Sequence, residues 1–305
     1  MIKKIDQGAW SVKGRRQVQE DAFILHEVLD TKDKSVILAG VFDGHLGSAA
    51  SDFCRNDLPV AFAAAMNVGI SDDIDNKNSD NENDTVFSPS TVQSFLELAW
   101  NECSESYRSM CAITDAECIA EYDPKEGILQ AKTGSQSAVA GTTAMVFAFD
   151  QLSNQLATLN CGDSRGIVLN GNNELVFQTT DHRPDVELER LTEMGNPPKC
   201  DIARWTIAVN NYDYSVARSL EGYLATSKGI ISDADVTLLT AQPGMTIIAA
   251  TDGLWDTIDT AEVTRAIAQL RQIKCSASDI AKALCSLAYD KGSSDNISVV
   301  ALCLE

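Results

Sequence analysis

Basic residues and histidine are scarce in this 305-residue chain, which has 24 Lys plus Arg against 44 Asp plus Glu and a net charge of −20. A chain so acidic repels phosphate backbones and anionic lipid, which disfavours nucleic-acid binding. Its three histidines, His26, His45 and His182, are too few for a His-rich zinc site. The many carboxylates instead suit hard ions such as Mg²⁺ or Mn²⁺. Any metal here should therefore be held by Asp and Glu.

Long hydrophobic runs and paired cysteines are also missing. Apolar runs such as residues 60–66 fall far short of the roughly 18 residues that a membrane span requires, and residues 1–8 lack the apolar segment of a leader. The nine cysteines are odd in number and form no C-x-x-C pair, which predicts neither a disulfide framework nor a zinc knuckle. We expect a soluble, monomeric protein of a reducing compartment, the cytoplasm or the nucleus.

Short apolar segments rich in β-branched residues predict strands along the chain. They cover residues 36–42, 144–149, 156–160, 166–169, 175–179, 246–250 and 297–304. The turn-forming stretches 150–154 and 170–173 join neighbouring segments and favour antiparallel hairpins over a parallel sheet. An α+β fold with stacked antiparallel sheets follows.

Predicted helices fall in blocks between these strands. The clearest begins near Pro89 with Ser88 as its N-cap, and its apolar stripe, a core-packing feature, contains Val92, Phe95, Leu96, Ala99, Cys103 and Tyr107. Further helices are expected at 260–270, at 276–289 after a capping box at Ser276, at 184–194, and at 48–66 with an interruption at Pro59.

One segment, residues 71–85, is acidic and Asn-rich and has a single strong hydrophobe, Ile74. It cannot bury enough apolar surface to order itself. We interpret it as a disordered surface insertion in a single domain that spans residues 1–305, with a regulatory or partner-binding role as the alternative.

Acidic clusters border the predicted strands and are the strongest signal in the sequence. Singly, each fits a turn, because Asp-Gly and Asp-Asn side chains bond nearby backbone N–H groups. Together they would repel one another unless a cation lay between them. The clusters are Glu20-Asp21, Asp43-Gly44-His45, Asp163 in Asn160–Arg165, Asp252 to Asp256, and Asp295-Asn296.

Carboxylates held on rigid strand ends meet the oxygen-ligand demand of Mg²⁺ or Mn²⁺. Two such ions about 3.5–4 Å apart can activate a bridging water for attack on an electrophile. Because the chain has no P-loop and no G-x-S-x-G elbow, hydrolysis of a phosphate ester fits better than nucleotide switching or acyl transfer.

At this point the sequence resembles the metal-dependent Ser/Thr protein phosphatases of type 2C over nearly its whole length. Eight motifs occur in the order of that family, and an ordered set of this size is far more specific than an isolated Asp-Gly-His. They are Gly14-Arg-Arg16 through Glu20-Asp21, Val41-Phe-Asp-Gly-His45, Gly141-Thr-Thr-Ala144, Asn160-Cys-Gly-Asp-Ser-Arg165, Asp181-His-Arg-Pro184, Val216-Ala-Arg-Ser219, Thr251-Asp-Gly-Leu-Trp-Asp256 and Gly292-Ser-Ser-Asp-Asn296.

The resemblance implies a four-layer α-β-β-α sandwich, two antiparallel sheets flanked by helices, with two metal ions at one edge. By motif position Asp43 would bridge both ions, and Asp252 and Asp295 would hold the first. The second would be held by the Gly44 carbonyl with Glu20 and Asp21, partly through water. Asp163 and Asp256, with Asp252, match a third, weaker metal position of the family.

The same resemblance assigns Arg16 to phosphate binding, where a guanidinium clamps two phosphoryl oxygens. It makes His45 the general acid that protonates the leaving seryl or threonyl oxygen. His182 fits an architectural role, and His26 has no motif support. Cys161 has no base beside it, and the chain has no C-x₅-R loop, so a cysteine-phosphatase mechanism is disfavoured.

Two positions depart from the family pattern. Glu221-Gly222 replaces the usual Gly-Asp, which leaves substrate selection open, and Leu46 stands where a small residue is common. We interpret the chain as a protein serine/threonine phosphatase that acts on phosphoprotein substrates in one step through a metal-activated water. A catalytically inactive phosphatase-fold scaffold, or a phosphatase for small phosphoesters, is the alternative.

Overall fold

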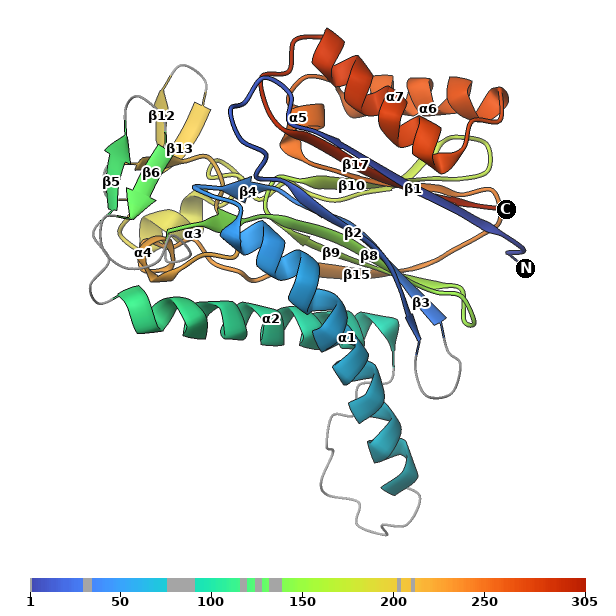
Figure 1. The fold of residues 1–305 in the computed structure, drawn as a ribbon, viewed down its shortest axis with the longest axis horizontal. Helices are drawn as coiled ribbons and strands as arrows, with labels where there is room; N and C mark the ends of the chain where they lie inside the picture. The colour runs from blue at the N-terminus through green and yellow to red at the C-terminus, as the bar shows by residue number, and fades with distance from the viewer. Residues whose placement is uncertain are drawn as a thin grey trace.

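The computed structural model describes residues 2–29, 35–75, 91–115, 120–123, 128–131, 139–201, 204–209 and 212–305. Two five-stranded antiparallel sheets form its centre (Figure 1). The first has the order β1 (Ile5–Val12), β17 (Ile297–Leu304), β16 (Thr246–Ala250), β10 (Arg165–Leu169) and β11 (Leu175–Gln178). The second has the order β15 (Asp235–Thr240), β9 (Gln155–Cys161), β8 (Ala144–Asp150), β3 (Ser35–Phe42) and β2 (Ala22–Leu29).

The central strands are apolar throughout because both of their faces are buried. In β8, Met145, Phe147 and Phe149 pack against the other sheet. The alternate residues Val146 and Ala148 pack toward the helices. The β17 strand behaves in the same way on the first sheet. Continuous apolar runs in an antiparallel sheet therefore mark strands enclosed between two layers.

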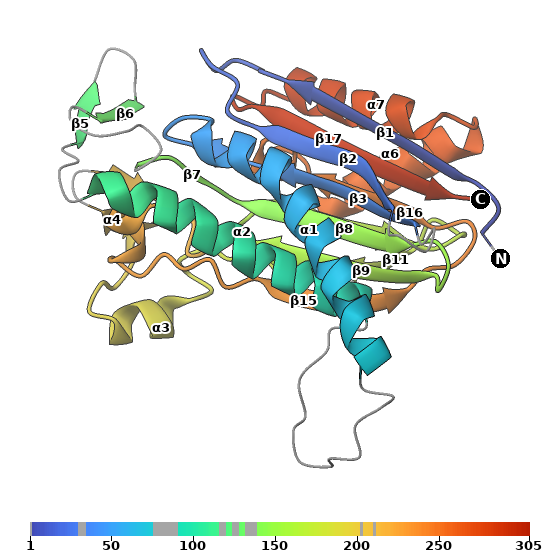
Figure 2. The ribbon, with the colours of Figure 1, turned by 60° about the horizontal axis from the view of Figure 1, so that its bottom comes forward.

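Helices cover the outer face of each sheet (Figures 1 and 2). The second sheet is covered by α1 (Ala49–Asp75) and α2 (Val92–Asp115), and all six members of the predicted α2 stripe are buried. The first sheet is covered by α5 (Asp252–Trp255), α6 (Thr260–Gln272) and α7 (Ala277–Asp290). The predicted four-layer α-β-β-α sandwich is confirmed, as is the capping box at Ser276.

Three helix predictions are corrected. The α1 helix is not interrupted at Pro59, since the carbonyl that the proline leaves free belongs to Arg55 on the exposed face, where water can bond it. It continues to Asp75, so the first five residues of the predicted insertion are helical, and residues 76–85 lie outside the described residues.

The other two corrections concern where helices begin. The α2 helix starts at Val92, where the Thr91 hydroxyl accepts a hydrogen bond from the Ser94 N–H. The predicted cap, Ser88-Pro89, lies outside the described residues. The predicted helix at 184–194 is shortened to α3 (Leu188–Glu193), because the Val186 N–H bonds the Arg183 carbonyl in a tight turn that precedes it.

A smaller lobe, which we call the flap (residues 181–201, 204–209 and 212–232), lies at one end of the sandwich. It contains α3, β12 (Lys199–Asp201), β13 (Arg204–Val209), β14 (Tyr212–Tyr214) and α4 (Tyr223–Thr226). Its own apolar cluster joins Leu191, Ile207 and Tyr214 to Leu46. Two short pairs complete the structure: β4 (Gly44–His45) with β7 (Gly141–Thr142), and β5 (Ala120–Asp123) with β6 (Ile128–Ala131).

Among the described helices, none is long and apolar enough to cross a bilayer.

Candidate active site

Strand pairing brings the predicted acidic residues to one end of the sandwich. In the second sheet, the start of β2 pairs with the end of β3, so Glu20 and Asp21 lie beside Asp43. The start of β8 pairs with the end of β9, which places Asp163 at the same end. In the first sheet, the end of β16 pairs with the beginning of β17, which brings Asp252 near Asp295.

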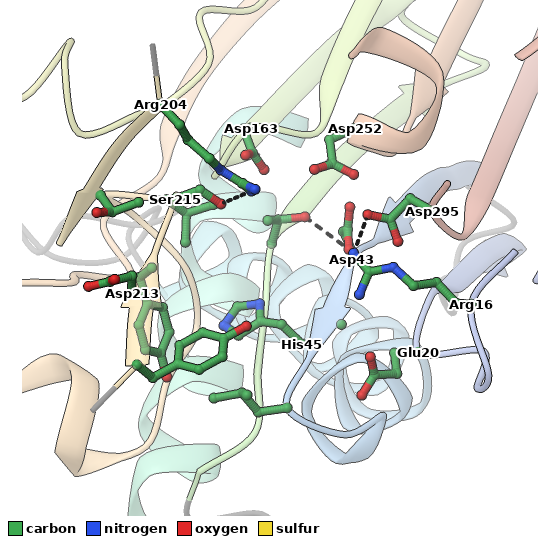
Figure 3. Close-up of a pocket in the computed structure, with 17 residues that line it drawn as sticks. Arg16, Glu20, Asp43, His45, Asp163, Arg204, Asp213, Ser215, Asp252 and Asp295 are labelled. Atoms are coloured by element: carbon green, nitrogen blue, oxygen red, sulfur yellow. Dashed lines mark hydrogen bonds and ion pairs between the residues drawn. The ribbon is translucent and has the colours of Figure 1, made fainter. Parts of the chain in front are cut away.

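A cleft of about 360 Å³ lies at this end, between the sandwich and the flap (Figure 3). Eight of the ten predicted site residues line it: Arg16, Glu20, Asp43, Gly44, His45, Asp163, Asp252 and Asp295. Figure 3 shows Asp43, Asp163, Asp252 and Asp295 gathered around a common space, with Arg16 reaching in from the side. The acidic clusters, each of which fits a separate turn when taken singly, therefore contribute to one site.

The other two predicted residues, Asp21 and Asp256, do not line the cleft. One carboxylate oxygen of Asp21 accepts hydrogen bonds from Ser298 at 2.7 Å and Thr251 at 3.1 Å. Its other oxygen is buried without a hydrogen-bond partner. Asp256 is exposed at the C-terminal end of α5, and its charge raises the pKa of Asp163 and Asp252.

The carboxylates perturb one another strongly. Burial, followed by the charges of Asp295 and Asp256, raises the pKa of Asp252 to about 6. Burial raises the pKa of Asp21 to about 7, and the nearby Asp252 charge adds to this rise. The Asp43 carboxyl group shares a hydrogen bond with Asp252, and burial with the Asp252 charge raises its pKa well above the ordinary range. In the absence of a cation, Asp21, Asp43 and Asp252 therefore bind protons more readily than an isolated carboxyl group does.

Arg16 provides a positive charge at the rim of the cluster. Its Nη2 atom lies 2.6 Å from the Asp295 Oδ2 atom, and the guanidinium is about half exposed. The loop that carries it is closely packed, since Gly14 has a φ of 60° and a Cβ there would lie 1.9 Å from the Asp295 carbonyl oxygen. A glycine is required at this position, and it fixes Arg16 beside Asp295.

Asn296 connects the two sheets behind the acidic cluster. Its side-chain amide donates to the Lys13 and Val18 carbonyls at 2.8 and 2.9 Å, and its Oδ1 atom accepts from the Glu20 N–H at 2.8 Å. The Glu20 carboxylate in turn accepts from the Gly47 N–H at 2.5 Å. The loops before β2, after β3 and before β17 are therefore held in one network.

The donor set of the cleft fits a hard divalent cation. It consists of carboxylate oxygens next to strand ends. Asp21, whose pKa responds to the charges of Asp252 and Asp295, adds one buried oxygen that has no hydrogen-bond partner. Within the described part of the chain, no three His, Cys, Asp or Glu side chains stand in a ready-made ligand arrangement. Instead Asp43 and Asp252 bond each other, and Asp295 bonds Arg16. A cation would replace the shared proton and neutralise the same charge.

His45 lies in the cleft against a carboxylate that the motifs did not reveal. Its Nε2 atom is 2.5 Å from the Glu221 Oε1 atom, and its ring meets the Tyr214 ring edge to face at 5.5 Å. Burial alone would lower the pKa of His45, but the Glu221 charge and hydrogen bond raise it. The only sequence signal for Glu221 was its departure from the family pattern.

The flap supplies a wall of the cleft that sequence reasoning also missed. Its lining side chains come from β13 and β14 and the residues after them: Arg204, Thr206, Tyr212, Asp213, Tyr214, Ser215 and Val216. Arg204 donates to the Ser215 hydroxyl at 2.9 Å and faces the acidic cluster from across the cleft (Figure 3). Apart from Val216, which begins the Val216–Ser219 motif, no motif spacing pointed to these residues, because they reach the cleft only through tertiary packing.

Several motif residues prove to be structural. Arg165 forms a two-bond pair with Asp181, at 2.9 and 2.7 Å, and stacks over Trp255. His182 is buried and its Nδ1 atom accepts from the Gly162 N–H at 3.1 Å, which supports its predicted architectural role. Cys161 is fully buried, and burial raises its pKa, so its thiolate is disfavoured. This agrees with the rejection of a cysteine nucleophile.

Comparisons by sequence agree on one family. The family model described as Protein phosphatase 2C matches residues 5–297. A relative from Oryza sativa subsp. japonica, "Probable protein phosphatase 2C 68", is 31% identical over 316 residues, which cover 96% of this chain and 76% of that protein. "Protein phosphatase 1B" of Mus musculus is 22% identical and covers 97% of this chain and 69% of its own length.

Comparisons with solved structures find the same fold. The serine-threonine phosphatase 2C of Toxoplasma gondii superposes with a TM-score of 0.75 at 20% identity, covering 99% of this chain and 95% of that one. A sex determining protein of C. elegans gives a TM-score of 0.73 at 19% identity, covering 99% of this chain and 65% of that one.

Proposed function

The chain belongs to the protein phosphatase 2C family, and from this premise we propose that its carboxylate cleft hydrolyses phosphoserine and phosphothreonine esters with divalent metal ions, Mg²⁺ or Mn²⁺. Its function as a protein serine/threonine phosphatase follows from the family. The observation that carries the proposed chemistry is the gathering of eight predicted site residues in one cleft. Their carboxylates repel one another, and a cation would relieve that repulsion.

In this proposal Asp43, Asp252 and Asp295 would hold one ion, and Asp43 and the Gly44 carbonyl, with Glu20 and Asp21 partly through water, would hold the second. A third, weaker position would use Asp163, Asp252 and Asp256. When bound, divalent cations lower the pKa of a coordinated water and offset charge on phosphoryl oxygens. The sheets contribute rigidity, because every one of these ligands except Asp256 lies within two residues of the end of a paired strand.

The remaining roles belong to two side chains of this chain. Arg16, half exposed at the rim, would bind the phosphoryl oxygens and orient the ester. His45 would donate a proton to the leaving seryl or threonyl oxygen as the P–O bond breaks. Its position on β4, directly after the Asp43-Gly44 ligands, fixes the donor close to the reacting group.

The alternative functions remain distinguishable. A scaffold without activity is disfavoured because every expected ligand is present in the sequence and six of the eight line the cleft. A preference for small phosphoesters has no specific support, although the chemistry at the carboxylates would be the same.

Hydrolysis of a panel of phosphoserine and phosphothreonine peptides, compared with small phosphorylated metabolites, tests the proposal. We expect peptide hydrolysis with Mg²⁺ or Mn²⁺, loss with EDTA, and loss in Asp252→Asn. Asp52→Asn, an exposed carboxylate on α1, is the matched control and should keep full activity. No hydrolysis with either metal would favour the scaffold, and faster turnover of metabolites would favour the small-ester alternative.

A further inference from the structure

His45 and Glu221 form a hydrogen-bonded pair at the back of the cleft, and their two side chains differ in exposure. The His45 side chain is 21% exposed, whereas Glu221 is only 1% exposed and lies behind it. The contact runs between Nε2 of the ring and Oε1 of the carboxylate. The imidazole therefore has one nitrogen committed to the protein interior, which leaves Nδ1 as the nitrogen available to a ligand in the cleft.

The backbone fixes both partners in one small ladder. His45 on β4 pairs with Gly141 on β7, and Thr142 on β7 exchanges two backbone hydrogen bonds with Leu220, at 3.0 and 2.9 Å. Because Glu221 follows Leu220 directly, the histidine and the carboxylate sit on segments that flank the same central strand. Their separation is set by backbone pairing.

Other groups also contact the Glu221 carboxylate, whose Oε2 atom is buried without a hydrogen-bond partner. The Ser219 hydroxyl donates to Oε1 at 2.5 Å. Gly141 makes room for the carboxylate, since a Cβ there would lie 2.2 Å from Oε1. The Tyr214 ring packs edge to face against the imidazole. Oε1 therefore bonds both the Ser219 hydroxyl and the His45 ring, which restricts the orientation of that ring.

We infer that Glu221 is a positioning residue for the proposed reaction: it holds the His45 ring by Nε2 so that Nδ1 faces the substrate. As the attacking water, which has lost one proton, bonds to phosphorus and the ester P–O bond breaks, the electron pair of the broken bond goes to the leaving seryl or threonyl oxygen, and the proton on Nδ1 moves to that oxygen. The Nε2–H stays bonded to Glu221, and the ring is left neutral. Glu221 itself does not touch the substrate.

The inference rests on the proposed function and concerns Glu221-Gly222, one of the two positions that depart from the family pattern. Its experiment compares kcat and KM on a phosphoserine peptide, a poor leaving group, and on p-nitrophenyl phosphate, a good one. A proton donor matters most for the poor leaving group. A misplacement of about 1 Å can lower the rate about 100-fold.

We expect Glu221→Ala to lower kcat on the peptide about 10- to 100-fold with little change in KM, and to change kcat on p-nitrophenyl phosphate by less than about threefold. Glu221→Gln, which keeps an oxygen acceptor, should retain more activity than Glu221→Ala. The double variant His45→Ala/Glu221→Ala should be no slower than His45→Ala alone, because the two residues act as a unit.

Glu187→Gln is the matched control. Glu187 is another buried carboxylate, bonded to Arg190 and Arg218, that has no contact with His45. Its loss should affect stability without any leaving-group selectivity. If Glu221→Ala does not fold, as judged by circular dichroism, Glu221→Gln and Ser219→Ala test the inference instead. Each should lower kcat on the peptide by a smaller factor and leave kcat on p-nitrophenyl phosphate unchanged.

Equal losses on the two substrates, or losses of Glu221→Ala and His45→Ala that multiply in the double variant, would overturn the role of Glu221. Failure of the proposed function looks different, since the wild-type enzyme would then fail to hydrolyse the phosphoserine peptide, whether or not it hydrolyses p-nitrophenyl phosphate. If His45→Ala shows leaving-group selectivity and the Glu221 variants do not, the proposed function stands and only this inference fails.

Discussion

At the scale of single residues, identical side chains acquire different chemistry from their surroundings. Burial and neighbouring carboxylates raise the pKa of Asp252 to about 6. Asp279, exposed at the start of α7, has a lowered pKa because it accepts hydrogen bonds from Ser276. The first is placed to exchange a proton for a cation near neutral pH, while the second serves the helix end.

The adjacent residues Arg15 and Arg16 also have different surroundings, and only Arg16 lines the cleft. Arg16→Ala should raise KM roughly tenfold or more, as expected for the loss of a charged hydrogen bond worth about 1.5–3 kcal/mol. The factor should be similar on a phosphopeptide and on p-nitrophenyl phosphate, because bonds to the phosphoryl group do not depend on the leaving group. Steady-state kinetics on both substrates checks this.

Arg15→Ala is the control, since its guanidinium donates to the Gly292 carbonyl at 3.0 Å and stacks over Tyr289, away from the cleft. An unchanged KM in Arg16→Ala would remove Arg16 from phosphate binding.

At the scale of elements, α1 carries an unusual residue for a long helix. Pro59 lies in its interior and leaves the Arg55 carbonyl without a helical partner. Pro59→Ala should raise the free energy of unfolding by about 1–2 kcal/mol, because the roughly 3 kcal/mol penalty of an interior proline is partly offset by the stiffness it gives the unfolded chain. Chemical denaturation measures the change.

Val60→Ala at a 68% exposed position should have little effect and serves as the comparison. A loss of stability in Pro59→Ala would show instead that the packing of α1 on the second sheet depends on the proline.

The elements also show which parts of the fold the sequence could predict. Every predicted strand is present, and these are mainly the central strands, whose two buried faces require apolar residues throughout. Three of the four edge strands, β1, β2 and β15, were missed. An edge strand has a neighbour on one side only, so its pattern can be mixed: β1 contains Asp6, Gln7 and Gly8. The remaining edge, β11, was recognised from the Asn-Gly turn before it.

The residues of the site also fall into those that the sequence could predict and those that it could not. Asp43, Asp163, Asp252 and Asp295 could be predicted because each adjoins a strand that the sequence reveals. Glu221 and the flap residues Arg204 and Tyr212 could not, since they reach the cleft through backbone bridges and packing between distant segments. Composition and spacing carry local information, whereas these positions depend on the tertiary structure.

At the scale of the whole molecule, the two sheets hold the acidic residues of the cleft together at one end of the sandwich. Raised pKa values mean that the folded protein without metal favours protonated carboxyl groups, whereas the unfolded chain ionises near pH 3.8. Between about pH 4 and 7 the folded state therefore binds more protons than the unfolded state, and the free energy of unfolding falls as pH rises. Metal binding should reverse this loss, since the cation takes the place of the protons.

The melting temperature with EDTA should accordingly fall from pH 5 to pH 8, and the increase caused by saturating Mg²⁺ should be larger at pH 8. At 100 times its dissociation constant the ion adds about 2.7 kcal/mol. Differential scanning calorimetry at both pH values, with and without Mg²⁺, measures this. Asp252→Asn removes one of the perturbed carboxyl groups, so it should flatten the pH dependence and shrink the metal-induced shift, whereas Asp52→Asn should change neither. A metal-induced shift that is equal at the two pH values would mean that protons and metal do not compete for these carboxylates, and the ligand assignment would have to be abandoned.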